Sequence, residues 1–334
     1  MTKFFKLLFL CSLMLGTLIA VSSYSWLSMW MGLEINLLSI IPLLSDSESV
    51  YPSEAALKYF LTQAMASAIL LFSIISSLNL NEFISQQPDY WWSMIMSSAL
   101  LTKMGAAPFH AWFPEVMEGL SWMNCLIMLT WQKLAPMAIL MYNVKTVPFL
   151  LAVVVSSLLV GGMVGINQIS LRKIMAYSSI NHIGWMVGSM LSSQAVWLTY
   201  FVIYSIITLN IVVMFQSAGT YYLKQLINSF NQTKMLKFLF AMNFLSLGGL
   251  PPFLGFFPKW ITINALVESN FLVLSVVLIV LTLITLYFYL RITFSALVIS
   301  SKELVVKTKP PQTFVIVMSN FLSLAGLVVC SMTF

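Results

Sequence analysis

The sequence predicts an all-α, polytopic integral membrane protein that forms a single membrane domain over residues 1–334. Of its 334 residues, 60% are hydrophobic and 8% are charged, whereas soluble domains carry about 25% charged residues. The apolar residues form runs long enough to cross a bilayer, and the connections between the runs carry most of the charges. The net charge of +6 comes from scattered residues, so it does not indicate a nucleic-acid partner.

A membrane-spanning helix needs about 20 predominantly apolar residues. Dividing the sequence at charged or turn-rich stretches predicts about eleven such helices. They cover residues 4–21, 25–44, 55–78, 91–108, 120–143, 147–167, 173–191, 194–217, 235–266, 271–298 and 312–333. No small-residue cleavage site follows the first run, so we expect a membrane span there and not a signal peptide. The ninth run contains Gly-Gly-Leu-Pro-Pro at 248–252, which cannot continue a helix.

Basic residues gather on alternate connections, which predicts the orientation of the chain. One side of the membrane receives Lys3, Lys6, Arg172, Lys173, Lys224, Lys234, Lys237, Lys302, Lys307 and Lys309. The opposite side receives Lys145 together with Glu82, Asp89 and Glu268. By the positive-inside rule, the N-terminus lies on the basic side and the C-terminus on the other.

The fourth and ninth predicted spans share a broken pattern. Residues 108–114 read Pro-Phe-His-Ala-Trp-Phe-Pro and residues 252–258 read Pro-Phe-Leu-Gly-Phe-Phe-Pro. Four spans lie between these two, an even number, so the fourth and ninth spans traverse the bilayer in opposite directions. This arrangement predicts an inverted repeat with two discontinuous helices, which line the ion path in many transporters. Its first half covers about 25–145 and its second about 147–298, and the alternative is a chance match.

Glu34, Lys103, Lys133 and Lys259 are ionisable residues that fall inside apolar runs or at breaks within them. At such depth a charge costs several kcal/mol and usually marks an ion pathway or a proton relay. Glu34 and Lys103 share a comparable depth, and at about 4 Å their attraction would be roughly 4 kcal/mol. Such a pair can act as a proton switch, because the carboxylate holds the proton on the lysine and its loss releases it. The alternative is a static buried ion pair that fixes helix packing.

Two lysines extend the predicted polar path beyond the Glu34–Lys103 pair. Lys133 is too deep to reach the headgroups, unlike Lys58, and Pro136 frees a backbone carbonyl near it. We therefore expect Lys133 in a hydrated interior and not on a lipid-facing surface. Lys259 follows the break at Pro258, where the alternative is a turn lysine that faces water.

Three further residues are possible contributors. His110 and His182 are the only histidines, and the imidazole titrates near neutral pH. Each is equally compatible with a proton relay and with a hydrogen-bonded packing role. We expect Arg291 to be a partly buried structural cation.

No motif for a metal or a redox cofactor is present. Cys11, Cys125 and Cys330 lie far apart in apolar segments, without the spacing of a metal or cluster site, so we expect them to pack as small hydrophobic residues. The sequence contains no P-loop, dinucleotide-binding glycine motif or zinc-protease motif. We therefore expect no cofactor and no metal on this chain.

Four stretches are similar to a known family. They are Gly-Leu-Glu-Ile-Asn at 32–36, Thr-Trp-Gln-Lys-Leu-Ala-Pro at 130–136, Ser-Leu-Arg-Lys-Ile-Met-Ala-Tyr-Ser-Ser-Ile at 170–180 and the segment 247–259. Over essentially its whole length the chain resembles the antiporter-like subunits in the membrane arm of mitochondrial NADH:ubiquinone oxidoreductase, respiratory complex I. The detail suggests the insect or wider arthropod form. The family is related to multi-subunit sodium/proton antiporters.

The resemblance implies roles and partners for this chain. The family has a Glu–Lys pair, a central lysine, and a lysine or glutamate on the second broken helix. Glu34, Lys103, Lys133 and Lys259 match these four positions in order. NADH, FMN, iron–sulfur clusters and ubiquinone would be bound by other subunits, and membrane lipids and other membrane-arm subunits would surround this one. The chain resembles the shorter animal form, which lacks helices that close one side of the bundle in larger relatives. The basic side would face the mitochondrial matrix and the C-terminus the intermembrane space.

Three functional hypotheses follow. The first is a complex I subunit that relays protons along Glu34–Lys103–Lys133–Lys259. The second is a free-standing cation/proton antiporter, although sodium sites favour clusters of carboxylate and carbonyl oxygens and only Glu34 is a deep carboxylate. The third is a structural spacer that moves no protons. The sequence leaves open whether a proton crosses this subunit or only an electrostatic signal passes along it.

Overall fold

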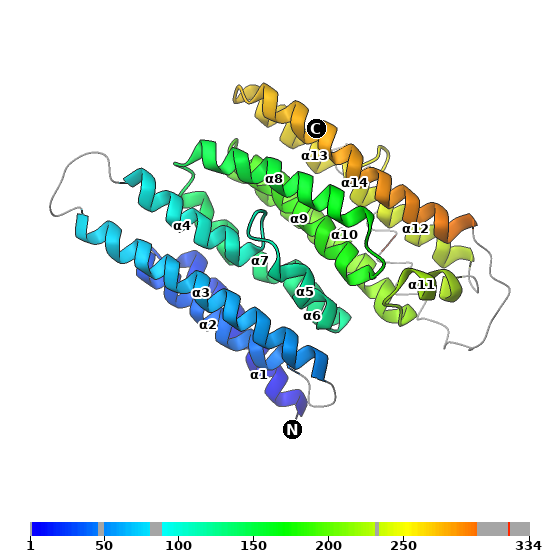
Figure 1. Ribbon diagram of the computed structural model, residues 1–334, viewed down its shortest axis with the longest axis horizontal. Coiled ribbons are helices and arrows are strands. Elements are labelled where there is room, and N and C mark those ends of the chain that lie inside the picture. Colours follow the sequence, from blue (N-terminus) through cyan, green and yellow to red (C-terminus); the bar gives the residue numbers. More distant parts are fainter. Residues whose placement is uncertain (1, 46–49, 81–88, 231–233, 299–319, 321–334) are drawn as a thin grey trace. The chain divides into compact units, whose positions relative to one another are not determined.

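The chain folds into helices joined by short connections (Figure 1). The computed structural model describes residues 2–45, 50–80, 89–230, 234–298 and Asn320. Within these ranges there is no β-strand, and an isolated antiparallel bridge joins Ser170 to Tyr222. The predicted all-α class is therefore confirmed, while most of the predicted last span at 312–333 lies outside the described residues.

The helices belong to two compact units, residues 1–153 and residues 154–334. Unit 1 contains α1 (Thr2–Ser22), α2 (Trp26–Leu44), α3 (Val50–Leu80), α4 (Asp89–Met104), α5 (Trp112–Gly119), α6 (Trp122–Leu129), α7 (Trp131–Tyr142) and the first part of α8 (Val147–Ile166). Unit 2 contains the rest of α8, α9 (Leu171–Met190), α10 (Gln194–Ala218), α11 (Leu223–Phe230), α12 (Lys234–Gly248), α13 (Phe256–Glu268) and α14 (Leu272–Val298).

Local sequence signals set several helix ends. The Ser25 and Ser193 hydroxyls accept hydrogen bonds from the backbone N–H of Ser28 and Val196, each at 3.3 Å, and so cap the first turns of α2 and α10. Helix α10 ends at Gly219, which has φ +62°, a left-handed conformation that glycine adopts at low cost.

Within unit 1, α2, α4 and α7 pack together and carry Glu34, Lys103 and Lys133. Helix α7 contacts both α2 and α4, while α3 contacts α2, α4 and α5. In unit 2, α9 contacts α10, α13 and α14. Helix α9 is the centre of that packing, since every residue from Ser178 to Met190 is buried.

Seven described helices are long and apolar enough to cross a membrane, fewer than the sequence predicts. The difference has physical causes. Predicted spans 91–108 and 235–266 are each interrupted, and 173–191 corresponds to α9, whose polar residues lie against neighbouring helices and not against lipid. The count of about eleven stays a prediction.

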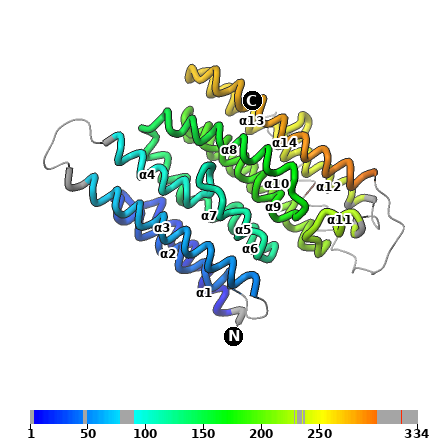
Figure 2. The backbone as a smooth tube through the Cα atoms, in the orientation of Figure 1, coloured from blue at the N-terminus to red at the C-terminus, as the bar shows by residue number. Residues whose placement is uncertain are grey.

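Both predicted breaks are present and have matching backbone conformations. Helix α4 ends before Gly105 and α12 ends before Gly249, and both glycines have φ +75°. In each break the glycine N–H donates to the carbonyl three residues earlier, Thr102 or Ser246, at 3.1 and 3.0 Å. The tube of Figure 2 leaves its helical path between α4 and α5. The pseudo-two-fold relation between the halves stays a prediction, as do the single membrane domain and its limits.

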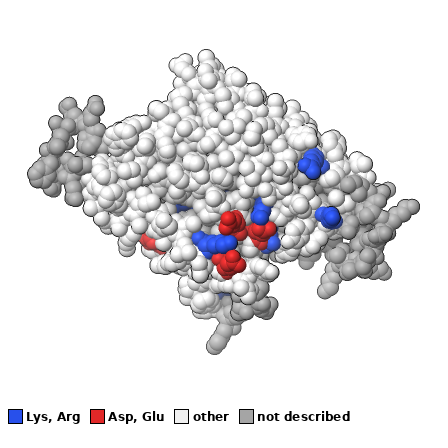
Figure 3. All heavy atoms as spheres, in the orientation of Figure 1, with Lys and Arg blue, Asp and Glu red and all other residues white. Residues whose placement is uncertain are grey.

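Large apolar side chains cover much of the surface. Phe4, Leu18, Met65, Val273 and Leu283 are each more than half exposed, as expected where helices meet lipid or neighbouring membrane helices. Charged side chains are few on the face shown in Figure 3. Cys125 is buried and Cys11 is exposed on α1, while Cys330 lies outside the described residues.

Candidate proton-relay residues

The predicted Glu34–Lys103 pair is present in unit 1. Lys103 Nζ lies 3.8 Å from Glu34 Oε1, and their side chains are 3% and 23% exposed. Lys103 lies in the last turn of α4, next to the break at Gly105. The pair is an ion pair with no direct hydrogen bond to Glu34 Oε1, so a small movement of either helix would change its strength.

A chain of hydrogen bonds accompanies this pair. Tyr59 on α3 donates its hydroxyl hydrogen to Gln132 Oε1 at 3.3 Å, and Gln132 Nε2 donates to Asn36 Oδ1 at 2.9 Å. Asn36 lies two residues after Glu34 on α2, and Gln132 precedes Lys133 on α7. Gln63 Nε2 donates to the backbone carbonyl of Lys103 at 3.2 Å. These buried amides connect the surroundings of the ion pair with those of the central lysine.

Lys133 is 1% exposed and lies inside unit 1. Its ammonium sits over the ring of Phe113, 5.4 Å from the centroid. The predicted fifth span is divided at Thr130, where the hydroxyl donates to the Leu126 carbonyl at 2.7 Å. Lys133 therefore lies in the first turn after a discontinuity, and Pro136 leaves the carbonyl of Gln132 without its helical partner. The expectation that Lys133 avoids the lipid-facing surface is met, and its hydration stays a prediction.

Lys259 lies at the second break, in unit 2. It is 7% exposed, and its ammonium donates to the carbonyl of Gly248 at 2.8 Å and lies 5.6 Å from the centroid of the Trp185 ring. A cation is favourable there because the final carbonyls of α12 carry the negative end of the helix dipole. The alternative of a turn lysine that faces water is therefore wrong.

Gly249 makes room for the Lys259 side chain. A Cβ at Gly249 would lie 2.7 Å from Lys259 Cδ and 2.9 Å from Nζ. The φ of +75° also disfavours any residue with a side chain. Both observations make glycine the residue that this break requires.

We expect Gly249→Ala to displace Lys259 from the Gly248 carbonyl. Gly219→Ala is the matched control, because Gly219 also has a positive φ of +62° but has nothing within 4 Å of its added Cβ. Both variants carry left-handed strain of about 1–2 kcal/mol. The difference in stability between them therefore measures the clash with Lys259. The midpoint of thermal unfolding of each purified variant measures the effect, and equal midpoints would contradict it.

His182 lies in a polar cluster of unit 2. Its Nδ1 is 2.9 Å from the Tyr200 hydroxyl, and the Tyr204 ring centroid is 5.0 Å away. A pocket of about 10 Å³ adjoins these rings and is also lined by Pro258, the residue before Lys259. A pocket of this size holds a single water at most. His182 thus lies beside the second broken helix.

His110 and Arg291 are placed differently. His110 is half-buried in the first break, and its Nδ1 lies 3.2 Å from the carbonyl of Pro108. This is a local contact and does not link His110 to Lys103 or Lys133. Arg291 is exposed near the end of α14, so the prediction of a partly buried cation is wrong.

The sequence interpretation missed Tyr59, Gln63 and Asn36 as polar neighbours of the ion pair. Each is 3–4% exposed and hydrogen-bonded across helices. The sequence does contain a signal for them, because an amide side chain within a membrane span usually has a polar partner on another helix. Which helix face they occupy could not be deduced from an apolar run that lacks clear periodicity.

Comparison with known proteins identifies the family. Residues 23–285 match the NADH:quinone oxidoreductase/Mrp antiporter transmembrane family. This chain belongs to that family. It is 46% identical to NADH-ubiquinone oxidoreductase chain 2 of Anopheles gambiae over 340 aligned positions, which cover 100% of this chain and 99% of the relative.

Solved structures agree with this assignment. A chain of respiratory complex I from Thermus thermophilus is 26% identical, with a TM-score of 0.87 over 98% of this chain and 79% of that chain. A chain of the Mrp complex from Dietzia sp. shares the fold, with 15% identity and a TM-score of 0.78 over 97% of this chain and 75% of that chain. The closer relation to the oxidoreductase members of the family supports the complex I hypothesis over the free-standing antiporter.

Proposed function

We propose that this chain is a membrane-arm subunit of mitochondrial NADH:ubiquinone oxidoreductase that relays protons through Glu34, Lys103, Lys133 and Lys259. The observation that carries the proposal is the burial of three lysines in a membrane-spanning member of this family, each at a helix break or discontinuity. Lysine can gain and lose a proton, and loosened backbone next to it offers polar groups and room for water.

The proposed sequence of events begins at the Glu34–Lys103 pair. When the pair is closed, the carboxylate stabilises the charged lysine; when it opens, the proton can pass toward Lys133, beside the Tyr59–Gln132–Asn36 hydrogen bonds. Lys259 and, next to its helix, His182 would continue the path in unit 2. NADH oxidation and ubiquinone reduction, with FMN and iron–sulfur clusters, would take place on other subunits. This chain would supply the coupled proton step, with its N-terminus in the matrix and its C-terminus in the intermembrane space.

Lys259→Met tests this proposal, because the thioether cannot carry a proton. We expect the variant to assemble and to lower the ratio of protons moved to electrons transferred in sealed vesicles by about twofold or more. Lys145→Met, which removes an exposed lysine, is the control and should leave the ratio unchanged.

The same vesicles distinguish the rival functions. A structural spacer predicts an unchanged ratio in Lys259→Met, and a cation/proton antiporter predicts that proton movement depends on sodium without NADH. We expect neither result.

A further inference from the structure

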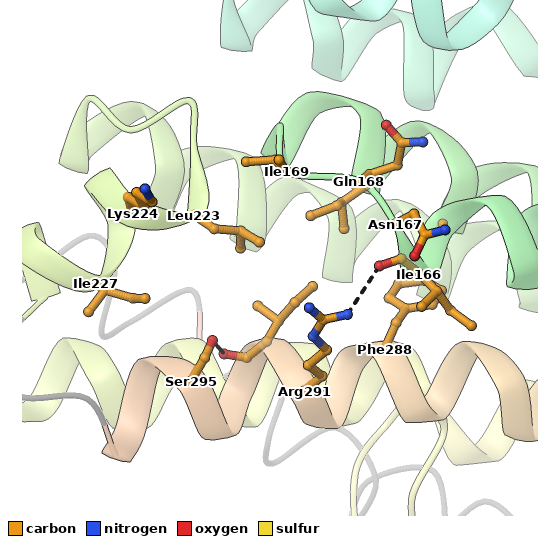
Figure 4. Close-up of a pocket in the computed structure, with 13 residues that line it drawn as sticks. Ile166, Asn167, Gln168, Ile169, Leu223, Lys224, Ile227, Phe288, Arg291 and Ser295 are labelled. Atoms are coloured by element: carbon orange, nitrogen blue, oxygen red, sulfur yellow. Dashed lines mark hydrogen bonds between the residues drawn. The ribbon is translucent and has the colours of Figure 1, made fainter.

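A pocket of about 390 Å³ opens in unit 2, away from the proposed relay residues. It lies between the α8–α9 connection, α11 and the final turns of α14 (Figure 4). The connection contributes Ile166 to Ile169, α11 contributes Lys224 and Ile227, and α14 contributes Phe288, Arg291 and Ser295. All three segments belong to the side of the membrane that the charge pattern predicts to be basic.

Two cations line this pocket. Figure 4 shows the Arg291 guanidinium extending from α14 toward the α8–α9 connection, where its Nη1 donates to the Ile166 carbonyl at 3.5 Å. A guanidinium has five N–H donors, and in the part of the chain that the structure describes Arg291 makes no other hydrogen bond or ion pair. Lys224 is exposed and likewise has no ion pair among the described residues.

No acidic side chain of the described residues of unit 2 lies at this pocket. Among residues 154–230 and 234–298, the acidic residue is Glu268 at the end of α13. The direction of the intervening helices places Glu268 on the opposite side of the membrane from α11. The described lining of the pocket therefore complements an anion.

The walls of the pocket require an amphiphile as its occupant. Apolar side chains of Ile169, Ile174, Ile227, Phe288 and Ile292 form much of the lining. Arg291 lies seven residues before the end of α14 at Val298, about 10 Å along the helix axis. This is the depth at which a phosphate can meet the guanidinium while acyl chains lie along α14, and basic pockets between membrane helices bind phospholipid headgroups in this way.

We propose that this pocket binds the phosphate of an anionic phospholipid, with Arg291 as the principal contact and Lys224 as the second. Arginine suits this role because its planar donors match phosphate oxygens in pairs. The apolar walls favour a lipid over free phosphate.

Photolabelling of the assembled complex in lipid nanodiscs tests the proposal. The discs contain phosphatidylcholine and a fixed fraction of photoreactive phosphatidylglycerol or, separately, photoreactive phosphatidylcholine. We expect the anionic probe to label residues 165–174 and 223–230 preferentially. Arg291→Gln should reduce this labelling by about tenfold, and Lys237→Gln, which removes a basic residue of α12 that does not line the pocket, should not reduce it.

A second variant and a competition experiment complete the test. If Arg291→Gln fails to assemble, Lys224→Gln on the exposed face of α11 replaces it and should also lower the labelling. Equal labelling by both probes, or labelling that neither variant reduces, would overturn the proposal. Complete competition by inorganic phosphate would replace the lipid with a free anion. Absence of labelling in an intact complex would also overturn the proposal.

Discussion

Lys133→Arg is expected to lower NADH-driven proton movement by about tenfold or more, because the relay needs a group that releases its proton as well as binds it. The guanidinium stays charged under all physiological conditions. It would keep a positive charge at this position while removing the ability to cycle. Lys133→Met should have a similar effect through the opposite change, because it removes the charge.

Because Lys133 is buried, we expect its substitution to reduce proton movement more than substitution of any other residue of the proposed path. At 1% exposure the ammonium cannot exchange its proton with bulk water directly. Its neighbours include the Phe113 ring and the backbone loosened at Thr130 and Pro136. A proton on Lys133 must therefore arrive and leave through the protein interior.

Sealed vesicles containing the assembled complex provide the measurement. Proton uptake and ubiquinone reduction are recorded together, and native electrophoresis verifies assembly. Lys58→Arg is the matched control, because Lys58 is 43% exposed and pairs with Glu54 and Glu115 on the surface, where ion pairs contribute little. An unchanged rate and proton-to-electron ratio in Lys133→Arg would show that Lys133 is a fixed charge.

The breaks and the ion pair could be predicted from the sequence because each follows from local chemistry. Consecutive glycine and proline residues end α12, and the motif at 108–114 marks the break after α4. Charges of opposite sign at similar depth in neighbouring spans have a strong reason to meet, since each would otherwise be buried alone. These arguments need only the position of a residue along its span.

The features that could not be predicted depend on helix rotation and tertiary packing. The Tyr59–Gln132–Asn36 hydrogen bonds require three helices to turn their polar residues toward one another. The sequence predicts a span at 173–191, but the complete burial of α9 from Ser178 to Met190 depends on how the neighbouring helices pack against it. The exposure of Arg291 depends on how α11 and the α8–α9 connection surround α14.

Glu34→Gln is expected to uncouple proton movement from electron transfer, with a loss of about tenfold in coupled turnover. At the observed 3.8 Å the carboxylate attracts the Lys103 ammonium by about 4 kcal/mol at an effective dielectric constant of 20. Glutamine has a similar shape but no charge, so Lys103 would be left with its charge in an apolar interior and would release its proton.

A double-mutant cycle separates this switch from a packing role. If Glu34 and Lys103 act as one unit, Lys103→Met combined with Glu34→Gln should lose little more than either variant alone, because the second change removes an interaction that is already absent. If the two residues act independently, the losses should multiply. Glu54→Gln is the control, since it removes a carboxylate that contacts Lys58 at 3.1 Å on the surface and should leave coupling intact. Full proton pumping by Glu34→Gln would leave the pair with a structural role only, because a carboxylate that is not needed for coupling cannot be the group that holds and releases the Lys103 proton.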